Sequence, residues 1–140
     1  MTIVARQAAL DRAGFSPGLI DGRDGRRTAL ALREFQAARG LAVTGRWDAA
    51  TSAALGTGDA AKSKPVPTPR AYTLTAADLR DVGPVPHYWN AKARLKRLTY
   101  ESLPALLAER GHCTQGLLAT LNPGRDLAHL RSGERGVLPN

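Results

Sequence analysis

Residues 20–55 read IDGRDGRRTALALREFQAARGLAVTGRWDAATSAAL, and this stretch contains one spaced motif twice. The two copies, 23 positions apart, are Gly22-x5-Thr28-x2-Ala31-Leu32 and Gly45-x5-Thr51-x2-Ala54-Leu55. Glycine supplies the positive φ of a tight turn, and a threonine hydroxyl can bond backbone donors near the start of a helix. An Ala-Leu pair can then face a core. The repeat therefore predicts one turn-and-helix unit that is used twice.

Three helices are expected around this repeat. Thr2 can cap a first helix that ends before Gly14. Residues 26–39 carry apolar side chains at helical spacing, and Asp48 can cap a short helix over residues 49–55. We therefore expect an all-α domain over residues 1–57.

The double motif belongs to a longer spaced pattern in the same part of the chain. That pattern is Ile20-Asp21-Gly22-x2-Gly25-x2-Thr28-x2-Ala31-Leu32-x2-Phe35-Gln36-x3-Gly40-Leu41-x3-Gly45-x5-Thr51-x3-Leu55. With it, residues 3–55 resemble the three-helix peptidoglycan-binding domain of bacterial cell-wall hydrolases and transpeptidases. One departure is Arg6, which precedes Gln7 where the family usually has an apolar residue. The resemblance implies a domain that holds the wall polymer without catalysis.

A polymer rich in carbohydrate and peptide is usually bound by a shallow groove of hydroxyls, amides and an aromatic ring. The candidate ligand-binding residues are Asp21, Arg23, Arg27, Thr28, Gln36 and Trp47. For Asp21, Gly22 and Gly25 turn formation is the favoured alternative, and Phe35 is assigned to the core. Gln36 stays open between bracing a loop and meeting ligand, because an unbonded buried amide costs about 1 to 3 kcal/mol.

Residues 58–69 combine small residues with three alternating prolines, which predicts a stiff linker between two units.

The net charge of +8 favours an anionic partner and is spread over residues 1–57, 58–69 and 70–140. One basic cluster over residues 90–97 could bind nucleic acid. Its cations are Lys92, Arg94, Lys96 and Arg97. The favoured interpretation is the solvated face of a short helix capped by Asn90, so nucleic-acid binding is the third hypothesis.

Residues 70–140 predict a small α+β module. Extended pieces are expected at residues 72–74, 98–100 and 136–138, and further helices at 76–80, 103–110 and 115–121. Thr75, Ser102 and Thr114 can cap these three helices. The strand at 98–100, the last two helices and the final strand give the order strand, helix, helix, strand. The whole chain is therefore expected to be mostly helical.

The sequence of this module also follows the pattern of a known family. It reads Leu98-Thr99-Tyr100-x-Ser102, then Leu107-Ala108-Glu109-Arg110-x-His112, then Leu117-Leu118-x-x-Leu121-Asn122-Pro123-Gly124, and finally Val137-Leu138-Pro139-Asn140. Residues 70–140 thereby resemble a degenerate lysin motif (LysM). More narrowly, they resemble the module between a peptidoglycan-binding domain and the catalytic domain of exported L,D-transpeptidases. Gly111, and Pro104 or Ala105, depart from the family's aromatic and acidic residues.

The sequence offers no recognisable catalytic or metal-binding constellation. An L,D-transpeptidase needs a thiolate beside a histidine in a Ser-His-Gly-Cys-type segment, and none is present. We expect Cys113, the single cysteine, to be a small buried hydrophobic residue. Calcium at residues 21–25 is not expected, because Arg23 and Arg26 stand where ligands belong. No cofactor is expected.

These patterns together predict a non-catalytic peptidoglycan-binding chain that positions an L,D-transpeptidase-type catalytic domain, which the chain lacks. The alternative is a protein-interaction or regulatory module for a cell-wall enzyme. No apolar run of 18 residues and no export leader is present, so membrane insertion is not expected. The resemblance implies a periplasmic or cell-wall-associated location.

Overall fold

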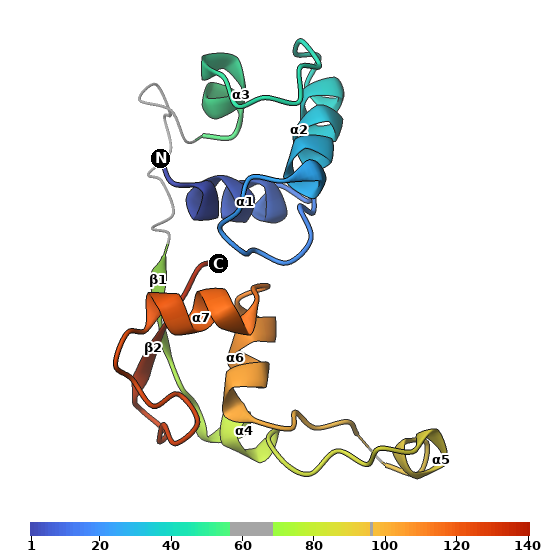
Figure 1. The fold of residues 1–140 in the computed structure, drawn as a ribbon, viewed down its shortest axis with the longest axis vertical. Helices are drawn as coiled ribbons and strands as arrows, with labels where there is room; N and C mark the ends of the chain where they lie inside the picture. Colours follow the sequence, from blue (N-terminus) through green and yellow to red (C-terminus); the bar gives the residue numbers. More distant parts are fainter. Residues whose placement is uncertain (57–68, 96) are drawn as a thin grey trace. The chain divides into compact units, whose positions relative to one another are not determined.

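The computed structural model describes residues 1–56, 69–95 and 97–140. Within them the chain is mostly helical, with a two-stranded antiparallel sheet (Figure 1). It divides into two compact units, Met1–Pro69 with Pro139–Asn140 and Arg70–Leu138. Residues 58–68 of the expected linker lie outside the described residues, and so does Lys96.

The first unit contains the three expected helices. They are α1 (Ile3–Arg12), α2 (Arg26–Ala38) and α3 (Ala49–Ala54). The Thr2 hydroxyl accepts a hydrogen bond from the Ala5 amide at 3.2 Å, and the Asp48 carboxylate accepts one from the Thr51 amide at 2.8 Å. Each bond satisfies an amide that has no partner within its own helix. Both predicted caps are therefore confirmed.

The core of the first unit lies between α1 and α2. Leu10, Ala31, Leu32 and Phe35 are buried there, as predicted for Phe35. Phe15 meets the Phe35 ring edge-on, with ring centroids 5.3 Å apart, a favourable arrangement of aromatic quadrupoles. The predicted core role of the second Ala-Leu pair is half wrong. Leu55 packs against the core and Ala54 is exposed, because α3 has only six residues and ends before Leu55.

The second unit combines helices with the sheet. Its elements are β1 (Arg70–Thr73), α4 (Ala76–Arg80), α5 (Trp89–Lys92), α6 (Leu103–Arg110), α7 (Gln115–Leu121) and β2 (Arg135–Leu138). β1 pairs with β2 from Arg70 opposite Leu138 to Thr73 opposite Arg135. α6 and α7 pack against each other and against β2. Leucines fill this core, among them Leu74, Leu106, Leu107 and Leu118.

The prediction of a strand at residues 98–100 is wrong. Tyr100 makes an isolated parallel bridge to Val82, and β2 pairs with β1 instead. A short apolar run indicates extended backbone, but its partner is decided by packing between distant parts of the chain. The expected order of strand, helix, helix, strand is therefore incorrect in its first strand.

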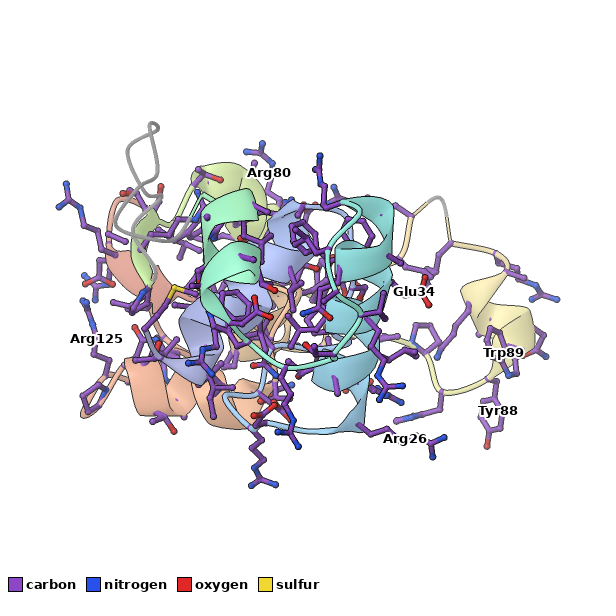
Figure 2. All side chains as sticks on the ribbon, turned by 90° about the horizontal axis from the view of Figure 1, so that it is seen from above. Arg26, Glu34, Arg80, Tyr88, Trp89 and Arg125 are labelled. Atoms are coloured by element: carbon purple, nitrogen blue, oxygen red, sulfur yellow. The ribbon has the colours of Figure 1, made fainter. Side chains whose placement is uncertain are left out.

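The prediction of a basic helix capped by Asn90 is also wrong. α5 begins at Trp89 with Tyr88 at its N-cap and ends at Lys92, and Figure 2 shows both aromatic residues there. The Asn90 side chain accepts a hydrogen bond from its neighbour Ala91 and caps nothing. Arg97 lies beyond the helix and pairs with Asp81 at 2.6 Å. Of the described cations proposed for nucleic acid, only Lys92 lies on α5, so Lys92, Arg94 and Arg97 do not share one helical face.

The described helices are short. The longest, α2, has 13 residues, whereas crossing a bilayer takes about 20 apolar residues. No helix in the described part of the chain could therefore span a membrane.

Candidate functional site

The buried side chain of Gln7 on α1 holds the first glycine turn. Its Nε2 donates to Asp21 Oδ1 at 2.9 Å, to the Arg23 carbonyl at 3.1 Å and to Thr28 Oγ1 at 3.2 Å. Its Oε1 accepts from the Gly22 amide at 2.9 Å. The hydrogen bond from Gln7 lowers the pKa of Asp21, against the opposing effect of burial. Asp21 is thus an ionised part of the turn, in keeping with the favoured turn-forming interpretation.

Gln36 on α2 repeats this arrangement at the second glycine turn. Its Nε2 donates to Thr44 Oγ1 at 3.2 Å, to the Arg46 carbonyl at 2.9 Å and to Thr51 Oγ1 at 3.0 Å, and its Oε1 accepts from the Gly45 amide at 2.9 Å. The exposed fraction of Gln36 is 0%. Of the two alternatives for Gln36, the geometry favours bracing a loop.

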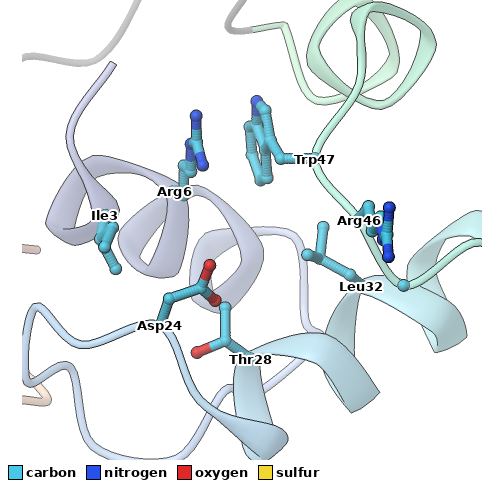
Figure 3. Close-up of a pocket in the computed structure, with 8 residues that line it drawn as sticks. Ile3, Arg6, Asp24, Thr28, Leu32, Arg46 and Trp47 are labelled. Carbon is cyan, nitrogen blue, oxygen red and sulfur yellow. The ribbon is translucent and has the colours of Figure 1, made fainter.

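A pocket of about 140 Å³ lies beside the two turns (Figure 3). Its lining includes Arg6, Asp24, Thr28, Leu32, Arg46 and Trp47. Among the six predicted ligand residues, Thr28 and Trp47 line this pocket. The other four, which the structure does not bring to it, are Asp21, Arg23, Arg27 and Gln36.

Arg27 and Arg23 lie elsewhere on the surface of the first unit. The aliphatic part of the Arg27 side chain covers Gly18, whose φ is +82°, so closely that an added Cβ would lie 3.1 Å from the Arg27 Cδ. Arg23 is exposed, and its backbone amide donates to Asp21 Oδ1 at 2.9 Å. These two arginines therefore belong to the rim of the turns and not to the pocket.

Arg6 and Trp47 form the distinctive wall of the pocket. The guanidinium carbon of Arg6 lies 5.3 Å from the centroid of the Trp47 ring, a cation–π distance, and Figure 3 shows the two side chains next to each other. The Nε of Arg6 is buried and has no hydrogen-bond partner among the described residues. An unpartnered buried donor is costly, so it marks a place where a ligand acceptor or water is needed.

The pocket offers complementary groups to one polar part of a ligand. Arg6 and Arg46 are permanent cations that can donate to a carboxylate, while the Asp24 carboxylate can accept from an N–H. The face of Trp47 can cover C–H groups. Sequence reasoning missed Arg6, Asp24 and Arg46. The only sequence signal for Arg6 was that a charged residue stands where the resembling family usually has an apolar one.

The second unit has a more open pocket of about 420 Å³. Its lining includes Pro104, Leu118, Asn122, Arg125, Asp126 and Leu127. The Asn122 side chain is committed to structure, since it donates to the Leu118 and Val137 carbonyls and accepts from the Val137 amide. This pocket therefore lies along α7 and the chain that follows it, with Pro104 near the start of α6 on another side.

Cys113 is a buried thiol. Its exposed fraction is 3%, and burial raises its pKa to about 11, which confirms the prediction of a small buried residue. At pH 7 only about one molecule in ten thousand would carry the thiolate. Among the described residues, no group of three or more metal-binding side chains is close enough to hold an ion.

The burial of Cys113 predicts slow chemical labelling. We expect a thiol-specific chromogenic disulfide reagent to react with the native chain at pH 7 at least about 100-fold more slowly than with the denatured chain. Absorbance under both conditions measures the ratio. Equal rates would show that the thiol is accessible and would reopen the question of a nucleophile.

The comparison with known families addresses the part of the chain that carries the Arg6–Trp47 pocket. Residues 3–55 match a family model. Its description is "Putative peptidoglycan binding domain". This peptidoglycan-binding match begins with α1 and extends just beyond α3, so it contains both glutamine-braced turns and every residue named for the Arg6–Trp47 pocket. It agrees with the resemblance predicted for the same residues. No curated protein matches the chain.

Proposed function

We propose that the chain binds bacterial peptidoglycan without catalysis, and that the pocket between Arg6 and Trp47 is the contact site. The observation that carries the proposal is the position of this pocket. It lies wholly within the residues that match a peptidoglycan-binding family, and it holds a buried guanidinium nitrogen with no partner among the described residues. A domain of this kind supplies attachment to the wall and leaves chemistry to another domain.

The size of the pocket limits what it binds. At about 140 Å³ it is smaller than the roughly 300 Å³ at which ordinary small-molecule sites begin, so it takes one group of the polymer and not a whole repeating unit. Two arginines and one carboxylate suit a group that has both a carboxylate and an N–H, as the stem peptides have. Arg23 and Arg27 are proposed to contact the flanking polymer from the rim.

The role of the second unit is also a proposal. The sequence pattern of residues 70–140 supports a LysM-like module. We propose that this module helps to position an L,D-transpeptidase-type catalytic domain in the periplasm or at the wall. The two-stranded sheet under α6 and α7 is compatible with such a module, although β2 pairs with β1. The open pocket beside α7 is the surface of this unit that we propose faces the polymer.

Wall binding predicts that the variant Arg6→Gln loses retention on insoluble peptidoglycan sacculi. We expect its dissociation constant to rise about five- to tenfold, because the charge over Trp47 and the donor to the ligand disappear together. Arg26→Gln makes the same change at an exposed position on α2 and is expected to bind as the unchanged chain does. Co-sedimentation at increasing protein concentration measures both, and raising the salt to physiological strength should weaken binding.

Two results would contradict this proposal at different levels. Retention of the unchanged chain no better than that of a size- and charge-matched protein would end the wall-binding proposal. Retention of Arg6→Gln equal to that of Arg26→Gln would leave wall binding in place and exclude the pocket. A stoichiometric protein partner without wall binding would favour the protein-interaction alternative.

A further inference from the structure

The second unit carries an arm that is fastened at its base. Val82 and Tyr100 form a bridge there, with the Gly83 amide donating to the Tyr100 carbonyl at 2.9 Å and the Tyr100 amide donating to the Asp81 carbonyl at 2.8 Å. We call the described residues between these contacts, 84–95 and 97–98, the aromatic arm. Figure 1 shows α5 on this arm, extended away from α4 and α6 of the same unit.

The aromatic arm exposes apolar side chains that a folded unit normally buries. Tyr88 is 77% exposed and Trp89 is 85% exposed, and Leu98 is 64% exposed near the base. Figure 2 shows Tyr88 and Trp89 together on the α5 part of the arm. Tryptophan and tyrosine each combine an apolar ring with a polar group, and neighbouring exposed apolar side chains mark an interaction surface.

The charged residues of the aromatic arm are all basic. Residues 82–100 contain four basic residues and no acidic one. The Lys92 ammonium lies 5.4 Å from the centroid of the Trp89 ring, which places a cation beside this exposed ring. Arg94 follows α5 and is exposed, while Arg97 pairs with Asp81 at the base. Lys92 and Arg94 are therefore the described cations of the arm that accompany its aromatic residues.

We propose that the aromatic arm docks on the surface of an anionic lipid bilayer. Tyr88 and Trp89 enter the boundary between headgroups and acyl chains, where tryptophan and tyrosine are enriched, and Lys92 and Arg94 pair with lipid phosphates. Exposed aromatic rings combined with nearby cations suit this occupant because an anionic membrane interface offers apolar and negatively charged surface at the same depth. The arm would lie on the membrane and would not cross it.

The test is co-sedimentation of the full chain with lipid vesicles at low salt. We expect binding to vesicles of three parts phosphatidylcholine and one part phosphatidylglycerol, and at least about tenfold weaker binding to phosphatidylcholine alone. The double variant Tyr88→Ser with Trp89→Ser should lose at least about tenfold in affinity for the anionic vesicles. Lys92→Gln with Arg94→Gln should lose about tenfold. The matched control is Arg26→Gln with Arg131→Gln, which removes the same charge from exposed positions outside the arm and should change binding less than about twofold.

Fluorescence gives an independent reading of the same contact. In a Trp47→Phe background, Trp89 is the sole tryptophan, and its emission should shift to shorter wavelength on anionic vesicles. Absence of vesicle binding, or equal binding by the aromatic double variant and the unchanged chain, would overturn the proposal. The proposal would also be overturned if the two double variants of the arm still bound vesicles but no longer bound sacculi. The same would hold if they still bound vesicles but no longer bound duplex DNA. Because Arg6→Gln leaves the arm intact, it should bind vesicles normally, which separates this proposal from wall binding.

Discussion

Replacing Gln36 with leucine is expected to lower the free energy of unfolding of the first unit by about 2 to 4 kcal/mol. The amide of Gln36 is wholly buried and bonds four groups of the second glycine turn. Leucine has a similar volume but bonds none of them. The Thr51 hydroxyl is buried and would lose its donor, and the Gly45 amide would lose the acceptor that fixes the turn.

Chemical denaturation followed by the fluorescence of Trp47 measures this loss. A Trp89→Phe background makes Trp47 the sole tryptophan, so the signal reports the first unit, where Trp47 packs against the core. Glu34→Leu places a leucine at an exposed position on the same helix and is expected to alter the free energy of unfolding by less than about 0.5 kcal/mol. A loss at Gln36 as small as that would show that the turn does not depend on the glutamine.

The helix starts were predictable from sequence because they depend on neighbours along the chain. A capping side chain accepts from an amide two or three residues later, and five predicted caps make that bond. They are Thr2, Asp48, Thr75, Ser102 and Thr114. Asn90 looked equivalent, but its segment has few apolar residues to hold a helix against a core, and α5 begins one residue before it.

The sheet could not be derived in the same way. Residues 98–100 and 70–73 both contain side chains that favour extended backbone, and only packing decides which of them pairs with β2. β1 is followed directly by Leu74, whose amide donates to the Glu134 carbonyl at 2.8 Å, so the pairing continues beyond the strand. Such a contact joins residues that are 60 positions apart, and no local pattern encodes it.

The candidate site was predictable only in part for a related reason. The 23-residue repeat correctly located both turns, and the same offset relates Arg23 to Arg46, a pocket residue that the prediction left out. The repeat does not show that Gln7 and Gln36 brace the turns, because each glutamine reaches its turn from a different helix. Arg6 was not among the predicted ligand residues, because its contact with the Trp47 ring joins two distant positions of the chain.

In the second unit, the largest expected loss of stability comes from changing another buried polar group, the carboxylate of Asp78. The Asp78 carboxylate on α4 accepts hydrogen bonds from the Thr75 amide at 2.9 Å, the Thr75 hydroxyl at 2.7 Å and the Tyr72 hydroxyl at 2.9 Å. Arg110 on α6 lies 3.4 Å from its other oxygen. One carboxylate thereby ties β1, α4 and α6 together. Asp78→Asn keeps the shape but loses the charge, and we expect it to cost the second unit about 2 to 3 kcal/mol.

The pH dependence follows from the pKa of Asp78. Burial raises this pKa, but the hydrogen bonds from Thr75 and Tyr72 and the charge of Arg110 outweigh burial, so the net shift is below the ordinary value of 3.8. A carboxyl with a lowered folded-state pKa stabilises the fold fully above the unfolded value and loses this contribution as the pH falls through the folded value. The difference in stability between the unchanged chain and Asp78→Asn should therefore be constant near neutral pH and shrink below about pH 4.

Calorimetry at pH 7 and at pH 3, with nuclear magnetic resonance signals of α4 and α6 to identify the second unit, measures that difference. Glu101→Gln removes an exposed carboxylate from the same unit and is expected to shift the transition by less than about 1 °C at either pH. If Asp78→Asn lost as much stability at pH 3 as at pH 7, the cause would be the asparagine amide itself, whose shape and N–H donors would disturb the site. In that case the negative charge of Asp78 would not be what joins α4 to α6.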